Sequence, residues 1–168
     1  KAMKLIETNQ KTVINFIVLI FALFIFRVFF AFTTWHPDLN NHADWGVRFF
    51  QYGAQKFYAP ESNVWNFTWP NQPPGTVYIF AGVRVLFEFI FNIFWQINLK
   101  IPAFPSTIIS YFETNLYPVL LKLPAIFADF GIAFLIYKWT NKKWASILWL
   151  VNPITWYNSA IWGQTDSI

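Results

Sequence analysis

The chain has 168 residues, of which 56% are hydrophobic, 23% are aromatic and only 12% are charged. Soluble domains carry about 25% charged residues, so this composition indicates an integral membrane protein, and we expect an all-α fold. The absence of Cys excludes disulfides and thiolate metal sites, and a net charge of +4 scattered among apolar runs excludes nucleic-acid binding. The chain starts with Lys and stops within a continuing pattern, so we expect an N-terminal fragment of a longer protein.

Residues 12–34 form the clearest predicted transmembrane span, with Arg27 as the one full charge. About 20 apolar residues suffice to cross a bilayer core. Lysines precede the span, so the positive-inside rule places the N-terminus in the cytoplasm. The richness in Phe, Ile, Asn and Lys favours a bacterial plasma membrane over the endoplasmic reticulum.

A large external loop is predicted over residues 35–115, with short amphipathic helices near 44–53 and 76–99. Asp44 either caps the first of these helices or acts as a general base. The second helix carries a polar stripe with a four-residue period, so it lies in the membrane interface or spans with its stripe facing other helices. The stripe consists of Arg84, Glu88, Asn92 and Gln96. An N-glycosylation sequon occupies residues 66–68.

Two further spans are predicted, over residues 117–137 and 144–158, joined by a lysine-rich loop at 138–143. If residues 76–99 lie in the interface, this loop falls in the cytoplasm, as the positive-inside rule favours. Pro153 is expected to bend the last span. Residues 159–168 then emerge on the same external side as Asp44 and begin a second part of the site.

Three charges are predicted at membrane depth, where charges are costly and usually functional. Arg27 and Lys122, together with interfacial Arg84, are candidates to bind the phosphate of a lipid carrier. The alternatives are that Lys122 snorkels to the interface and that Arg27 and Asp129 pair with other helices.

Four polar residues are candidates to hydrogen-bond a sugar or acceptor: Asp38, His42, Gln164 and Asp166. Asp38 is also a second candidate base, and Gln164 and Asp166 have capping of a following helix as their alternative. The two His and two Asp of residues 35–58 lack tight ligand spacing, so no zinc site is predicted. We expect no cofactor, with Mg²⁺ or Mn²⁺ as the alternative.

Four segments, taken in this order, resemble a known family: ADWGVRFFQYG, WPNQPPGTVY, KLPAIFADFGIAFLIY and NPITWYNSAIWGQTDSI. They look like the N-terminal part of a GT-C glycosyltransferase, a membrane enzyme that uses polyprenyl-phosphate sugars. The last segment is similar to an external motif of dolichyl-phosphate-glucose-dependent glucosyltransferases and the GPI mannosyltransferase, and closer to bacterial mannosyltransferase-like proteins. Asp44-Trp45 stands where several relatives, including protein mannosyltransferases, carry an Asp-Glu pair.

This resemblance implies a GT-C-like N-terminal module and inverting transfer of a hexose, such as mannose or glucose, to an acceptor hydroxyl. Asp44 matches the catalytic Asp of the first external loop. The implied partners are a polyprenyl-phosphate-sugar donor, a glycan, lipid or protein acceptor, and membrane lipids. In relatives, later spans build much of the donor groove, so the fragment alone is expected to be inactive. A lipid-linked-sugar flippase or transporter and a non-catalytic membrane scaffold are the alternatives.

Overall fold

The computed structural model describes residues 2–62 and 69–168, with side chains from residue 13 onward, so the sequon at 66–68 lies outside the described residues. The described residues are helical and contain no strand. In chain order the elements are α1 (Ala2–Thr33), α2 (Asp38–Lys56), η1 (Pro60–Ser62), α3 (Pro74–Lys100), α4 (Ser106–Thr140), α5 (Lys143–Val151), α6 (Pro153–Trp156) and η2 (Tyr157–Trp162).

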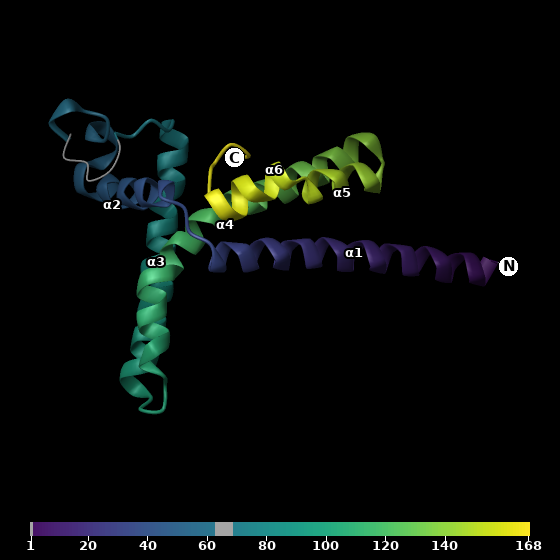
Figure 1. The fold of residues 1–168 in the computed structure, drawn as a ribbon, viewed down its shortest axis with the longest axis horizontal. Coiled ribbons are helices and arrows are strands. Elements are labelled where there is room, and N and C mark those ends of the chain that lie inside the picture. Colours follow the sequence, from purple (N-terminus) through teal and green to yellow (C-terminus); the bar gives the residue numbers. More distant parts are fainter. Residues whose placement is uncertain (1, 63–68) are drawn as a thin grey trace.

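One part of the molecule is a bundle in which two long apolar helices, α1 and α4, pack with the short helices α5 and α6. α1 runs beside the second half of α4, and α5 and α6 fold back along α4 toward the start of its second half (Figure 1). Aromatic rings fill the contact between α1 and α4, where Phe24 stacks on Phe127 and meets Phe130 edge to face. Such pairs add stabilisation beyond the apolar area they bury.

The other part is a helical hairpin that runs crosswise to α1. α3 and the first half of α4 lie side by side, and α4 then bends to join the bundle (Figure 1). Pro118 and Pro124 lie inside α4. A proline inside a helix removes a backbone donor and clashes with the preceding turn, which accounts for the bend.

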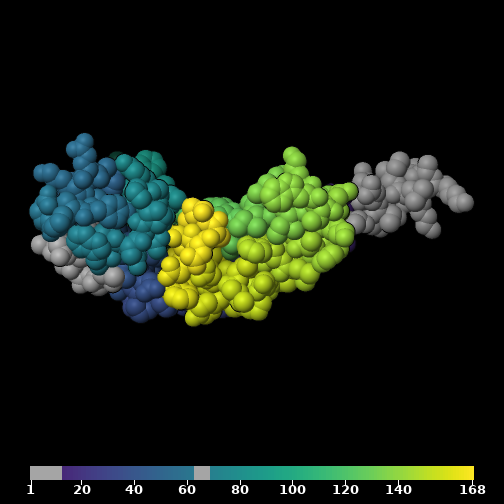
Figure 2. Space-filling view, turned by 90° about the horizontal axis from the view of Figure 1, so that it is seen from above, coloured from purple at the N-terminus to yellow at the C-terminus, as the bar shows by residue number. Residues whose placement is uncertain are grey.

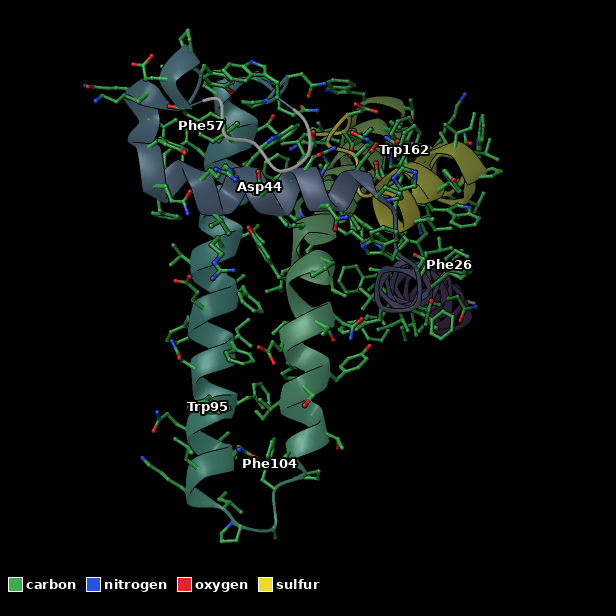
Figure 3. All side chains as sticks on the ribbon, turned by 60° about the vertical axis from the view of Figure 1, so that its left-hand side comes forward. Phe26, Asp44, Phe57, Trp95, Phe104 and Trp162 are labelled. Carbon is green, nitrogen blue, oxygen red and sulfur yellow. The ribbon has the colours of Figure 1, made fainter. Side chains whose placement is uncertain are left out.

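α2 lies across the hairpin near one end, and most of α3 and the first half of α4 extend away from it (Figure 3). Its buried Trp45 packs in a core with Phe80 of α3 and Leu121 of α4. Gly46 allows this close approach, because a Cβ atom there would collide with the hydroxyl of Tyr117. α2 begins at Asp38, so Asp44 is inside the helix and does not cap it.

Three described helices, α1, α3 and α4, are long and apolar enough to cross a membrane, which fits a membrane-embedded protein. α1 and α3 run crosswise to each other in two views, so they cannot both follow the normal of one flat bilayer (Figures 1 and 3). Residues 144–158, expected as one bent span, are not a single helix. α5 ends at Val151, and Asn152 adopts an extended conformation before Pro153, as steric contact with a following proline favours.

Candidate functional site

The N-terminus of α2 and the C-terminal segment meet at Asp38. Trp162 Nε1 and Gln164 Nε2 both donate hydrogen bonds to Asp38 Oδ2, at 2.6 and 2.9 Å. His36 lies at the same place, with its ring 5.1 Å from that of Trp162 and its Nδ1 accepting the backbone N–H of Asp38. The Asp38 side chain remains 36% exposed. This group, called the Asp38 cluster below, is an accessible carboxylate held by two side-chain donors.

The backbone around Gly163 explains how the C-terminal segment reaches Asp38. η2 is a π-helical turn that ends at Trp162, and Gly163 follows it with a φ of 80°. A Cβ atom at Gly163 would lie 2.5 Å from Leu39 Cδ2 and 3.2 Å from Lys122 Cγ. Only a glycine adopts this conformation at low cost and fits between the two side chains. The sequence Trp162-Gly163 therefore turns the chain back against α2. Figure 2 shows the C-terminal residues, in yellow, beside the blue and teal part of the surface.

The remaining C-terminal polar groups fasten the segment to its surroundings. Asn158 Nδ2 donates to Asp166 Oδ2 at 3.0 Å, and Ser167 Oγ donates to the carbonyl of Ala125 at 3.2 Å. Thr165 Oγ1 lies 3.4 Å from Gln72 Oε1, which links the segment to the Pro-rich residues 69–73 that precede α3. Gln164 and Asp166 were both predicted site residues, and the structure brings Gln164 to Asp38 while Asp166 faces Asn158.

Asp44 lies two turns further along α2 and is more enclosed than Asp38. Its Oδ2 accepts a hydrogen bond from Arg48 Nε at 2.9 Å, and both side chains are only 10% exposed. An Asp four residues before an Arg favours such a pair on one helix face. Asp44 is therefore an enclosed carboxylate paired with Arg48, and the side chains of Trp162 and Gln164 bond to Asp38 instead.

His42 is buried between α2, α3 and the Gly163 turn. Its ring stacks on Phe80 at 4.6 Å, and it faces the backbone of Gly163. Burial lowers the pKa of His42 to about 4, against the opposing effect of Asp38. Nδ1 has no hydrogen-bond partner among the described residues. The role of His42 as a substrate-binding group stays a prediction.

Arg27 and Asp129 form an ion pair between α1 and α4, in which both side chains are buried. The Arg27 guanidinium also donates to Ser159 Oγ at 3.0 Å and to the carbonyl of Leu150 at 3.0 Å. Of the two sequence-based alternatives, pairing with another helix accounts for these contacts. Phosphate binding by Arg27 stays a prediction, and the complete burial of its side chain argues against it.

Lys122 is also fully buried, at the C-terminus of α1. Its ammonium donates to the carbonyls of Thr34 and Ala31, at 2.6 and 3.3 Å. The last carbonyls of a helix have no partner within the helix, so a cation there satisfies them. Snorkelling and the assignment of Lys122 to a lipid phosphate both stay predictions.

Arg84 lies on α3, where Nε donates to Glu88 at 2.8 Å and the guanidinium lies over the rings of Phe87 and Tyr117. The four-residue period of the polar stripe places Arg84 and Glu88 on one helix face, where they pair. Arg84 lines a hollow of about 400 Å³ between α3 and α4 that has no lining residue from the Asp38 cluster. Its assignment to a lipid phosphate stays a prediction.

Sequence reasoning did not place Trp162 in the site. Its indole N–H is a hydrogen-bond donor beside an Asp 124 residues away, a contact that spacing cannot reveal. A Trp directly before Gly at the end of an apolar run was the available signal, because interfacial Trp commonly keeps its N–H toward a polar partner. Within the described ranges, no three His, Cys, Asp or Glu residues gather as a metal site.

Comparisons with models of known protein families, with curated proteins and with solved structures give no match to this chain.

Proposed function

We propose that the chain is the N-terminal part of a membrane glycosyltransferase that moves a hexose from a polyprenyl-phosphate carrier to an acceptor hydroxyl on the external side. The observation that carries the proposal is the contact of Asp38 with Trp162 and Gln164. This contact joins the first predicted external loop to the segment that resembles an external motif of GT-C glycosyltransferases. Three long apolar helices fit the membrane setting.

The crosswise arrangement supports a topology for this proposal. With α1 and the second half of α4 crossing the bilayer, α3 and the first half of α4 lie along its surface (Figure 1). α3 has a polar stripe and exposes apolar residues such as Phe89 and Leu99, as an interfacial helix does. The Asp38 cluster follows the C-terminus of α1 and so falls at the water boundary, where a hydroxylated acceptor and a lipid-linked donor can meet.

The proposed reaction is an inverting displacement. A carboxylate of α2 accepts the proton of the acceptor hydroxyl, whose oxygen attacks the anomeric carbon. The bond from that carbon to the phosphate oxygen breaks, and the lipid phosphate leaves with the electron pair. Asp44 is the proposed base, on the strength of its match to the GT-C motif, and Asp38 is the second candidate because its side chain is the more exposed.

The test uses the protein expressed from its complete reading frame, in membranes supplied with radiolabelled polyprenyl-phosphate hexoses. Asp44→Asn and Asp38→Asn preserve shape and remove the base. We expect Asp44→Asn to reduce transfer at least a hundredfold, since general base catalysis contributes about 10²–10⁴-fold, and Asp38→Asn to reduce it less. The reverse ranking would assign the base to Asp38. Transfer at the wild-type rate in both variants would refute the proposed role of α2.

A further inference from the structure

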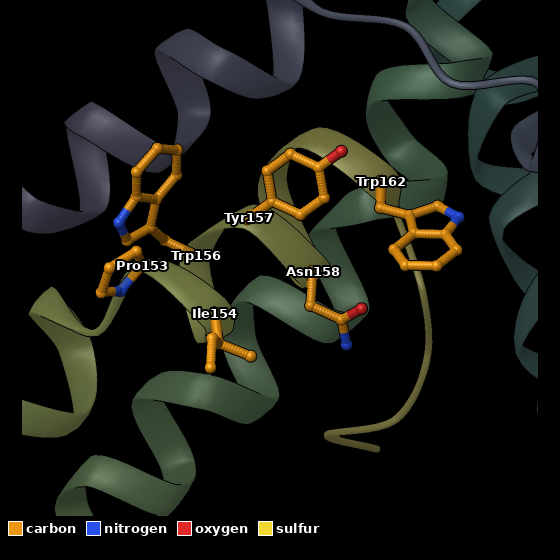
Figure 4. A pocket seen from close by; sticks show the side chains of 6 residues that line it. All are labelled: Pro153, Ile154, Trp156, Tyr157, Asn158 and Trp162. Atoms are coloured by element: carbon orange, nitrogen blue, oxygen red, sulfur yellow. The ribbon is translucent and has the colours of Figure 1, made fainter.

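A hollow of about 360 Å³ opens at the surface of α6 and η2 (Figure 4). Its wall is almost wholly apolar and aromatic, and Ile154 at its edge is 78% exposed. Ligand pockets commonly begin at this size and are mostly apolar. The residues that line it are Pro153, Ile154, Trp156, Tyr157, Asn158 and Trp162.

The hollow shares two residues with the polar site. The Trp162 ring lines the hollow while its Nε1 donates to Asp38. Asn158 also lines the hollow, and its Nδ2 donates to Asp166. An apolar surface and a polar, hydrogen-bonding surface therefore adjoin across single side chains. A ligand that covers both surfaces has an apolar chain joined to a polar head.

The charges where the hollow meets the polar surface, called the junction below, indicate which polar head group can bind there. Asp38 and Asp166 place two carboxylates at the polar end, and both keep exposed surface. Two cations of the neighbouring helices already have partners within the protein. Arg27 pairs with Asp129, and Lys122 donates to the carbonyls at the end of α1. A phosphate at this junction would be repelled by the carboxylates, whereas sugar or glycerol hydroxyls would donate hydrogen bonds to them.

We propose that the hollow holds the hydrocarbon chain of a lipid acceptor, whose neutral, hydroxylated head lies against Asp38 and Asp166. This inference rests on the proposed function and narrows its acceptor to a lipid, in place of a protein or a soluble glycan. It also assigns this junction to the acceptor and leaves the phosphate-bearing donor to another surface.

The probe is a glucosyl diacylglycerol with a photoreactive diazirine in one acyl chain. It is mixed into phosphatidylcholine nanodiscs that hold the protein from its complete reading frame, and labelled peptides are mapped by mass spectrometry. We expect labelling within residues 153–162, and competition by excess unlabelled glucosyl diacylglycerol but not by phosphatidic acid with the same chains. Equal competition by phosphatidic acid would overturn the assignment to a neutral head.

A pair of variants tests the hollow itself. Ile154→Trp fills it, and Leu148→Trp adds the same bulk at an exposed position of α5 outside its wall. We expect labelling to fall at least fivefold in the first variant and to stay unchanged in the second, with equal thermal midpoints showing that both fold. Unchanged labelling in Ile154→Trp, or no labelling of 153–162 in the wild type, would refute the lipid site.

Labelling needs no turnover, so it separates this inference from the proposed reaction. If labelling follows the prediction but the protein transfers no hexose, the lipid site is supported and the enzyme proposal is refuted. Hexose transfer to acceptors without labelling at the hollow would refute the lipid site alone.

Discussion

Arg27 of α1 and Asp129 of α4 form a buried ion pair across 102 residues of sequence. The guanidinium reaches two further elements through Ser159 and the carbonyl of Leu150. The Arg27 side chain therefore connects α1, α4, α5 and η2. By holding η2 in place, it positions the residues that follow, Trp162 and Gln164, for their contact with Asp38.

Removing one member of this pair is expected to leave an uncompensated buried charge. Asp129→Leu should lower the free energy of unfolding by about 3–5 kcal/mol, while Arg27→Met with Asp129→Leu should recover much of that loss. The measurement is the thermal midpoint of the purified protein in detergent. Glu88→Gln, which breaks the exposed pair with Arg84, is the control and should cost less than about 1 kcal/mol. Equal costs for Asp129→Leu and Glu88→Gln would contradict this account.

Lys122→Met tests the contact of the ammonium with the end of α1. The substitution leaves the carbonyls of Thr34 and Ala31 without their donor and should lower stability by about 1–3 kcal/mol. Lys138→Met removes an exposed lysine of the same helix and should change the thermal midpoint little. If the two variants melt alike, the buried contact does not hold the helix end.

Gly163→Ala should detach the C-terminal segment from α2, because the added Cβ meets Leu39 and Lys122 and the positive φ is strained for alanine. We expect a Cys pair at Asp38 and Gln164 to be joined readily by a short bifunctional maleimide in the parent and several-fold less readily with Gly163→Ala. Gly82→Ala, where a Cβ meets nothing within 4 Å, is the matched control and should leave cross-linking unchanged. Equal cross-linking in all three proteins would show that the glycine turn does not position the segment.

Because His42 is buried, we expect the free energy of unfolding to fall in acid. Burial holds its pKa at about 4 in the folded chain, against an ordinary value of 6.5. The unfolded chain then binds the extra proton first, so stability is full above pH 6.5, declines as the pH falls toward 4, and levels off below. The difference between the two pKa values corresponds to a loss of about 3 kcal/mol in the free energy of unfolding. Thermal midpoints across this pH range should fall less steeply in His42→Phe than in the wild type, and parallel curves would contradict the buried neutral imidazole.

The helices were largely readable from the sequence, because apolar runs and prolines mark them. The helix expected over residues 76–99 lies within α3, which begins at Pro74, directly after Pro73. The start of α2 was placed too late, although Pro37 followed by an acidic residue is itself a signal for a helix N-terminus. Residues 144–158 satisfied a hydropathy pattern, yet Asn152 and Pro153 break the helix within them.

Long-range partners could not be read in the same way. The Arg27–Asp129 pair was one of two open alternatives, because the costs of burying a charge and of pairing it depend on which helix lies opposite. Asp38 and Gln164 were expected on the same side of the membrane, but their direct contact depends on the bend of α4 and the turn at Gly163. Neither follows from periodicity alone.

The most direct test of the central claim compares sugar transfer with sugar movement in one preparation. Proteoliposomes holding the protein from its complete reading frame receive a radiolabelled polyprenyl-phosphate hexose and a lipid acceptor, and both the glycosylated product and the sidedness of the donor are measured. The account predicts a new glycolipid of inverted anomeric configuration, which Asp44→Asn abolishes. Donor that crosses the bilayer at the same rate in wild type and Asp44→Asn, with no glycosylated product, would contradict it and identify a flippase instead.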